Sequence, residues 1–533
     1  MKISSSITNL RVRLNQVKPS IVFLILALVV GGYVRLVYVL ASPFPLNDGG
    51  LFYQMTQELI ANQFRLPVVT DYNHLGIPYA YPPLAFYLTG LLSQLTGWSL
   101  LEVYRILPAI VTILTIPAFY LLAKDMIDDD NQLAVAVLIF SLSPVTYNWA
   151  IMGGGVTRSI AFFTALLTLH FLFRLYVEDK PVNLFWVAIL TSLTILTHPE
   201  TGFHTAATVP VFWLFYQRNQ KGTIQTLVIK VLTITFTAPW WVQVIGQHGF
   251  SPFTAAFLTA GQDGNAFVDL FNLSLTDEAG VRSIAFLGMI GFFLFIARKR
   301  YFLPSLLLIS YFIAPRSAKI FIAPMLAVFA SYALVTVMNL LDQWRRGSVG
   351  NNGEKLFAAT IISKVLLALL FSQWFTAGIR VLLPFTFIKM TEADQSAFNW
   401  IKANTDADSR FVIVTGYLWS SDPVSEWMPA LTARKSVGTV QGTEWLGGGR
   451  FMDAVVGSRV LQSCLDESVS CVEDWAENYQ ADYDHVYIRK LELDVVEGKA
   501  YIPVRNALAD LLKHDTNYEL IYETAEVSIF EKK

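Results

Sequence analysis

Long apolar runs recur along the first 390 residues and strongly restrict the folds available to this chain. Most are close to the roughly 20 residues that an α-helix needs to cross a bilayer. Only 15% of all residues are charged, whereas a soluble domain carries about 25%. This charge content is too low to cover a water-facing surface. Much of the surface must therefore face lipid. The sequence predicts 11 membrane spans, at 21–40, 103–123, 132–150, 156–177, 182–198, 201–217, 223–245, 281–297, 301–315, 317–341 and 357–385.

The first run, 21–40, is longer than the apolar part of a signal peptide, and no Ala-x-Ala cleavage site follows it. We therefore expect a first membrane helix, preceded by a cytoplasmic arm at 1–20. The formal net charge is −2, which gives no indication of a nucleic-acid partner.

Lysines and arginines predict the orientation of the spans, because short cytoplasmic loops collect them. The stretch 81–97 is apolar but short, and it could either cross the membrane or lie in the interface. If it does not cross, the basic loops around Lys180, Lys221 and 298–300 share the cytoplasmic side with the N-terminal arm. If it crosses, the cluster at 298–300 faces outward. We therefore expect an interfacial helix here, within a first outer loop at 41–102.

The same orientation places the polar tail, 391–533, outside the cytoplasm. Helical spacing at 393–403 and 504–514, and strand patterns at 410–415, 484–488 and 518–522, predict a soluble α/β domain after a membrane domain at 21–390. Cys464 and Cys471 are the two cysteines of the chain. They could form one disulfide in an external domain, and two free thiols are equally compatible with the sequence.

Asp48 follows the first predicted span directly, in the segment PLNDGG at 45–50. Because helical spacing begins at Leu51, Asp48 could be an N-cap that accepts from the free amides of a helix. It could also be a general base at the membrane surface. About 30 residues later, the segment YPPL at 81–84 opens the interfacial stretch.

This pairing resembles the glycosyltransferase C superfamily, multi-span enzymes that take a sugar from a polyprenyl-phosphate carrier outside the cytoplasm. In that superfamily an acidic residue of the first outer loop is the catalytic base. Its mannosyl- and aminoarabinosyl-type members follow with a (Lys/Tyr)-Pro-Pro-Leu segment. The resemblance implies that Asp48 is the base and that Tyr81 lines the substrate. This chain has Asp48-Gly49 where many members have Asp-Glu, and Tyr81 where several have lysine.

A lipid-phosphate donor needs cations on the outer side of the membrane. Arg158 ends the segment GGGVTR at 153–158, where the glycines could hold a phosphate or permit close helix contact. Arg316 and Lys319 lie between two predicted spans, where they could bind the donor phosphate or extend toward the interface as long side chains often do. We take Arg158, Arg316 and Lys319 as candidate phosphate ligands.

The segment HPETGFH at 198–204 joins two predicted spans on the same side. Its spacing is not that of a zinc-binding helix, so we expect His198, Glu200 and His204 to line the substrate and not to hold a metal. The loop 246–280 is long enough to be a lid over a substrate. Trp445 could stack on a sugar, although packing is the favoured interpretation.

The expected function is transfer of a sugar from a polyprenyl-phosphate donor to an acceptor outside the cytoplasm, with inversion, by an enzyme of the cell membrane. The acceptor (protein, lipid or polysaccharide) is open, no cofactor is required, and a divalent metal is compatible. A transporter or flippase of lipid-linked sugars is the main alternative. It predicts repeated halves with broken helices, and no such halves are evident. A non-catalytic envelope-assembly protein is the third alternative.

Overall fold

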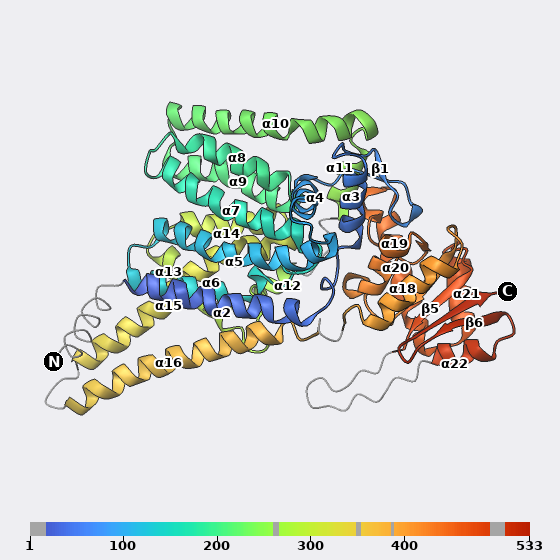
Figure 1. Cartoon of the computed structure of the whole chain (residues 1–533). Coiled ribbons are helices and arrows are strands. Elements are labelled where there is room, and N and C mark those ends of the chain that lie inside the picture. Colours follow the sequence, from blue (N-terminus) through green and yellow to red (C-terminus); the bar gives the residue numbers. More distant parts are fainter. Residues whose placement is uncertain (1–17, 260–265, 348–352, 385–387, 491–506) are drawn as a thin grey trace, which may run out of the picture.

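The computed structural model describes residues 18–259, 266–347, 353–384, 388–490 and 507–533. It has two parts, a bundle of long helices and a C-terminal domain that carries a β-sheet at one end of this bundle (Figure 1). Helix α2 begins at the opposite end of the bundle (Figure 1). The fold is thus a helical membrane-type domain followed by an α/β domain, as the sequence predicts.

Each of the 11 predicted spans overlaps one α-helix of the bundle. Five of them, α2, α5, α7, α10 and most of α15, are long and apolar enough to cross a membrane, while α6, α8, α13 and α14 are shorter apolar helices. The number of crossings therefore stays a prediction. The bundle helices are α2 (Pro19–Ala41), α5 (Leu100–Met126), α6 (Asp130–Leu142), α7 (Gly155–Tyr176), α8 (Asn183–Ile195), α9 (Pro199–Tyr216), α10 (Gln220–His248), α13 (Ser283–Ala297), α14 (Phe302–Ile313), α15 (Pro315–Gly347) and α16 (Gly353–Arg380).

Glycines bring several bundle helices into close contact. A Cβ atom on Gly291 of α13 would lie 2.0 Å from the carbonyl oxygen of Phe329 in α15. A Cβ on Gly31 of α2 would lie 2.8 Å from Ile116 Cδ1 in α5. Small residues at such contacts are the usual way for membrane helices to pack, because lipid gives apolar side chains little reason to associate.

Arg35 is a charged residue inside the bundle, on α2, and is fully buried. Its guanidinium donates to the carbonyls of Gly31 (2.9 Å) and Ser141 (2.7 Å) and to Thr146 Oγ1 (3.0 Å), and lies over the ring of Tyr147 (4.4 Å). An ionised group is expensive at such a place unless it is paired. Arg35 thereby ties α2 to the segment that follows α6.

The first outer loop holds α3 (Gly50–Ala61), a short hairpin of β1 (Val69–Thr70) and β2 (Ile77–Pro78), and α4 (Leu84–Thr96). At about 1.5 Å per residue, the 13 residues of α4 span roughly 20 Å, which is less than a bilayer core. Helices α3 and α4 lie at the end of the bundle that faces the C-terminal domain (Figure 1). Helices α6 and α8 also have 13 residues, so the interfacial position of α4 stays a prediction.

The predicted lid, 246–280, contains two helices, α11 (Ser251–Thr259) and α12 (Ala266–Phe271), and residues 260–265 lie outside the described part. Helix α11 contacts a short 3-10 helix, Thr443–Trp445, in the C-terminal domain. This loop therefore joins the two parts of the chain at their common end.

The C-terminal domain has a five-stranded sheet of order β4-β3-β5-β7-β6. Strand β3 is parallel to both β4 and β5, whereas β7 is antiparallel to both β5 and β6. The predicted helices and strands correspond to α18, α22, β3, β5 and β6. The elements are α18 (Glu392–Asn404), β3 (Arg410–Val414), α19 (Pro423–Thr432), β4 (Lys435–Ser436), α20 (Arg450–Ser463), α21 (Val469–Asn478), β5 (His485–Arg489), α22 (Ala507–His514), β6 (Tyr518–Glu523) and β7 (Val527–Lys532).

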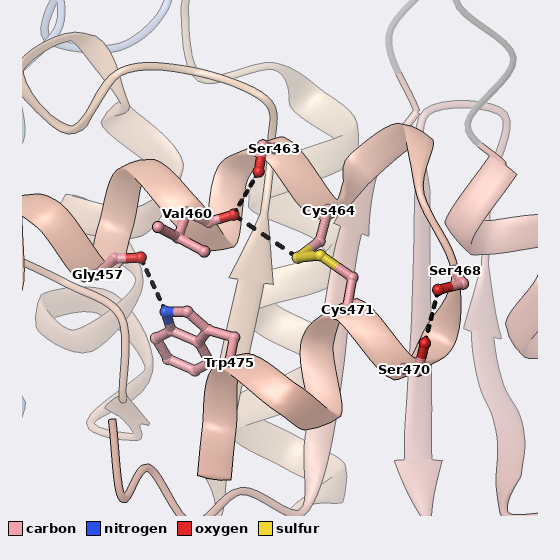
Figure 2. Close-up of a disulfide and its surroundings, with 8 residues drawn as sticks. All are labelled: Gly457, Val460, Ser463, Cys464, Ser468, Ser470, Cys471 and Trp475. Carbon is pink, nitrogen blue, oxygen red and sulfur yellow. Dashed lines mark hydrogen bonds between the residues drawn. A yellow bond between two sulfur atoms is a disulfide. The ribbon is translucent and has the colours of Figure 1, made fainter. Parts of the chain in front are cut away.

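Cys464 and Cys471 form a disulfide, so the first of the two sequence alternatives holds (Figure 2). The bond closes the short connection between α20 and α21. The indole of Trp475 donates to the carbonyl of Gly457 (2.8 Å), which joins the same two helices a turn away (Figure 2). Helices α20 and α21 are therefore fixed to each other twice.

The C-terminal domain and the first outer loop share one buried apolar core. Phe44 and Tyr53 from the loop pack against the ring of Trp427 in α19, with ring centroids 4.8 and 5.6 Å apart. Asn73 exchanges two hydrogen bonds with the backbone of Ser436 (2.7 and 2.8 Å). The domain is thus docked onto the outer loop rather than linked loosely to the bundle.

Candidate active site

Asp48 lies between α2 and α3, and its side chain is not the N-cap of α3. The N-cap is Gly49, which has no side chain to accept a hydrogen bond. The Asp48 carboxylate turns instead toward α7, where Oδ2 pairs with Arg158 Nη2 at 2.5 Å and Oδ1 accepts from the Gly154 amide at 3.2 Å. The helix-capping interpretation of Asp48 is therefore wrong.

The segment after α6 forms the other wall of the site. The sequence predicts helix as far as residue 150, but α6 ends at Leu142, before Pro144. Residues beyond it turn back so that the Gly153 amide donates to Leu46 O (2.8 Å) and the Gly154 amide to Asp48 O (2.9 Å). Proline lacks the amide that a continuing helix would use, which accounts for the early end.

Glycines are required where these two segments meet. A Cβ on Gly153 would lie 2.2 Å from Asp48 O, and a Cβ on Gly154 would lie 2.6 Å from Asp48 Oδ2. Gly49 has a φ of +131° and would place a Cβ 2.8 Å from the backbone of Gly153. Glutamate at position 49, as many members of the superfamily have, could not fit here without moving the backbone.

Arg158 projects from the first turn of α7 and is held by two contacts. Nη2 pairs with Asp48, and Nε donates to the carbonyl of Trp149 at 3.1 Å. The side chains of Arg158 and Asp48 are 25% and 21% exposed. The pair is therefore fixed in place and still open to a ligand.

Tyr81 reaches the same turn of α7 from the first outer loop. Its hydroxyl donates to Thr157 Oγ1 at 3.2 Å, next to Arg158, and its ring packs against Trp445 at 5.8 Å. Burial raises the pKa of the Tyr81 phenol, and the negative charges of Glu200 and Glu444 act in the same direction. Tyr81 is thus a neutral hydrogen-bond donor at physiological pH. Trp445 is buried and packs, as expected.

The segment at 81–84 also contacts the turn between α8 and α9. The amide of Leu84 donates to the carbonyl of Leu196 at 2.9 Å. Two motifs far apart in the sequence, 81–84 and 198–204, therefore lie side by side, with Glu200 close enough to Tyr81 to affect its pKa.

Glu426 of α19 is a residue that sequence reasoning missed. Its Oε1 accepts from the amides of Gly49 (2.8 Å) and Gly50 (3.0 Å), and it is 4% exposed. Its apolar sequence neighbours Val424, Trp427 and Met428 indicate that this glutamate is buried, and a buried glutamate needs a specific partner. The sequence does not reveal that the partner lies more than 370 residues away.

Comparison with known proteins gives matches in sequence and in fold. Residues 80–242 match the family profile described as "Dolichyl-phosphate-mannose-protein mannosyltransferase". This segment is less than half of the chain and begins after Asp48. No curated protein sequence matches the chain significantly.

Solved structures match over most of the chain at low identity. The oligosaccharyltransferase of Archaeoglobus fulgidus has 15% identity and a TM-score of 0.58, covering 88% of this chain and 69% of its own. ArnT from Cupriavidus metallidurans, bound to undecaprenyl phosphate, has 13% identity and a TM-score of 0.53, covering 96% and 97%. The arabinofuranosyltransferase AftD from Mycobacteria has 13% identity and a TM-score of 0.51, covering 96% of this chain and 40% of its own.

The chain has a glycosyltransferase C fold. The resemblance read from Asp48 and the segment at 81–84 is thereby confirmed at the level of fold. In this fold the first outer loop, α7 and the C-terminal domain meet at Asp48.

Lys319, the other candidate cation whose side chain the structure describes, contacts carboxylates of the predicted lid. Lys319 pairs with Asp269 (2.6 Å) and lies 3.8 Å from Asp277, both in the predicted lid. Asp277 in turn accepts from Asn148 at 3.0 Å. The Arg316 side chain lies outside the described part of the structure.

The two histidines of the segment 198–204 contact neighbouring groups of the protein. His198 is the N-cap of α9, and its Nδ1 accepts from the Thr201 amide at 3.2 Å. His204 is 1% exposed, contacts Ser317 Oγ through Nε2 (2.9 Å) and stacks on Phe321. We therefore assign His204 to the packing of α9 on α15. Within the described ranges, no group of three or more acidic, histidine or cysteine side chains could hold a metal ion.

Proposed function

We propose that this chain is a membrane glycosyltransferase that moves a sugar from a polyprenyl-phosphate donor to an acceptor outside the cytoplasm, with inversion. The observation that carries the proposal is the Asp48–Arg158 pair, held open between the first outer loop and α7 in a glycosyltransferase C fold. ArnT, which has this fold, was solved with undecaprenyl phosphate, and this supports a lipid-phosphate donor here.

Asp48 is the proposed general base. Oδ2 is occupied by Arg158, whereas Oδ1 has the longer contact to Gly154, so Oδ1 is the oxygen that takes the proton of an acceptor hydroxyl. The acceptor oxygen then bonds to the anomeric carbon while the bond from that carbon to the phosphate oxygen breaks. One displacement inverts the anomeric carbon and releases polyprenyl phosphate.

Arg158 is the proposed partner of the leaving phosphate. Its Nη2 contacts Asp48 and its Nε donates to the carbonyl of Trp149, which fixes the guanidinium beside the proposed base. A fixed cation beside a developing negative charge stabilises a transition state without reorganisation. Because Lys319 already neutralises Asp269, we place Arg316 ahead of Lys319 as the second phosphate ligand.

The proposed mechanism requires no metal, because the Arg158 cation already compensates the charge of Asp48. Tyr81 and Glu200 are proposed to line the substrate, since the charges of both Glu200 and Arg158 act on the Tyr81 phenol. Their hydroxyl and carboxylate groups suit the hydroxyls of a sugar.

The proposed location is a cell membrane, with the active site outside the cytoplasm. The Ser20 amide donates to Asp130 Oδ2 (3.0 Å), so the loop after Lys124 lies with the start of α2, at the end far from the C-terminal domain. The loop after Lys124 and the disulfide thus belong to opposite ends of the bundle. Disulfides persist in oxidising compartments, which supports an external C-terminal domain.

The test uses the purified full-length protein in lipid nanodiscs with polyprenyl-phosphate donors that carry mannose, aminoarabinose or arabinofuranose, plus envelope extract as acceptor. Asp48→Asn should lower kcat by about 10²–10⁴-fold, the usual contribution of a general base, and leave donor binding unchanged. Asp71→Asn is the control, an exposed aspartate of the same loop. Full turnover by Asp48→Asn removes Asp48 from this role, and donor crossing the bilayer of sealed proteoliposomes without sugar loss favours a flippase.

A further inference from the structure

The start of α3 is held by the side-chain carboxyl group of a glutamate from the C-terminal domain. The first amides of a helix have no partner within the helix and carry partial positive charge. Here the Gly49 and Gly50 amides donate to a single oxygen, Glu426 Oε1, at 2.8 and 3.0 Å. Both glycines follow Asp48 directly, so this contact fixes the backbone that carries the proposed base.

Glu426 is itself fixed by contacts on every side. Its Oε2 accepts from Gln441 Nε2 at 2.9 Å, and its backbone carbonyl accepts from the Tyr72 hydroxyl at 2.7 Å. The next residue, Trp427, donates its indole N–H to Asn47 O at 2.8 Å. Two successive residues of α19 therefore hold the backbone before and after Asp48.

Close backbone contacts leave no room for α19 to move toward α3. A Cβ on Gly50 would lie 2.4 Å from the carbonyl oxygen of Glu426. On the opposite side, the Gly154 amide holds the Asp48 carbonyl at 2.9 Å. Asp48 is thus clamped between α19 of the C-terminal domain and the segment that precedes α7.

We propose that Glu426 is a positioning residue for Asp48, through which the C-terminal domain completes the active site. This inference rests on the proposed function, because it matters for catalysis only if Asp48 is the base. Glu426 thereby supplies the acceptor oxygen for the amides that follow Asp48, where Gly49 itself has no side chain.

The charges around Glu426 give this contact a pH dependence. Burial raises the pKa of Glu426 to about 8, and the nearby Asp48 carboxylate adds to the rise, while the two glycine amides and the Arg158 cation oppose it. Tyr72 faces it from the first outer loop, and Glu444 acts on the same tyrosine from the C-terminal domain. Protonation of Glu426 is therefore favoured at neutral pH, and its ionisation at higher pH adds a second anion beside Asp48.

Two variants separate positioning from charge. Glu426→Ala removes the acceptor of both amides, and a displacement of the base by about 1 Å can cost about 10²-fold in rate. We expect this loss in kcat with the donor KM unchanged. Glu426→Gln keeps an oxygen acceptor and mimics the neutral acid, so its kcat at pH 7 should stay close to wild type. Glu477→Ala, an exposed glutamate of α21, is the control.

The pH profile is a readout that a purely structural role would not move. In the wild type, ionisation of Glu426 places a second anion that competes for Arg158, so kcat should fall as the pH rises through about 8. In Glu426→Gln this fall should disappear. A Glu426→Ala variant with wild-type kcat, or a fall that persists in Glu426→Gln, overturns the proposal.

Hydrogen exchange separates this proposal from the proposed function. The Gly49 and Gly50 amides should exchange faster in Glu426→Ala than in the wild type, whether or not any sugar is transferred. If the wild type has no transferase activity while Glu426→Ala still shows this faster exchange, the proposed function alone is overturned. Unchanged exchange at Gly49 and Gly50 overturns the positioning role alone.

Discussion

Arg158 Nη2 and Asp48 Oδ2 lie 2.5 Å apart, although the two residues are separated by more than 100 positions. Helix α7 supplies the cation and the first outer loop supplies the anion. The pair joins two of the three segments from which the candidate active site is built, and the C-terminal domain supplies the third.

Replacing Arg158 tests this pair. Arg158→Lys keeps the charge but cannot contact both Asp48 and the carbonyl of Trp149 as the guanidinium does. We expect a fall of about 10-fold or more in kcat and weaker binding of polyprenyl phosphate, since charge-assisted hydrogen bonds contribute about 1.5–3 kcal/mol. Native mass spectrometry measures the lipid, and exposed Arg450→Lys is the control. Unchanged kcat and lipid binding would contradict the role of Arg158.

Removal of divalent metals should leave the activity intact. Asp48 Oδ2 already has a cationic partner in Arg158, so charge compensation does not depend on a metal. The measurement is sugar transfer after incubation with EDTA, with Mg²⁺ or Mn²⁺ added back. Activity that is lost on chelation and restored by one of these ions would show that a metal takes part.

Gly49→Ala should disrupt the junction at Asp48. The substitution would place a Cβ 2.8 Å from Gly153 C at a φ of +131°, which costs about 1–3 kcal/mol in strain. Thermal unfolding in detergent should begin at lower temperature, and transfer should fall with it. Gly246→Ala is the control, because no atom lies within 4 Å of its Cβ position. Equal stability of the two variants would show that the junction tolerates a side chain.

Loss of the disulfide should weaken the C-terminal domain without stopping transfer. The bond closes a loop with a sequence separation of 7, and such a short loop contributes about 2 kcal/mol in the chain-entropy account. Cys464→Ser with Cys471→Ser should therefore unfold at lower temperature. Gel mobility with and without reductant on intact cells checks that the bond forms there. A pair of thiols that stays reduced in cells would contradict an external domain.

Periodicity and apolar runs predict the helices well because each helix buries or exposes its own stripe of side chains. The α6 region shows the limit of this argument. Residues 143–150 are apolar enough to continue a span, yet Pro144 ends the helix and Arg35 of α2 draws Thr146 and Tyr147 inward. A charge inside another helix decides the course of this segment.

The residues of the candidate site also divide into those that sequence motifs predict and those that only the fold reveals. Asp48, Tyr81 and Arg158 stand in short motifs, and the structure brings all three to the first turn of α7. Glu426 has no such motif, because its function lies in two backbone amides of a distant glycine pair. Lys319 shows the reverse case, since its nearest carboxylate, Asp269, lies in a loop that the sequence treats as a lid. Pairings of this kind depend on how the segments fold back in space.

The contact between α19 and the first outer loop also constrains when the protein can work. A ribosome makes the chain from its N-terminal end, and domains fold in that order, so Asp48 enters the membrane long before Glu426 and Trp427 exist. A nascent chain therefore carries the base without the groups that hold its backbone. If Asp48 is the base, the site is complete only after α19 has been translated and has folded onto the first outer loop.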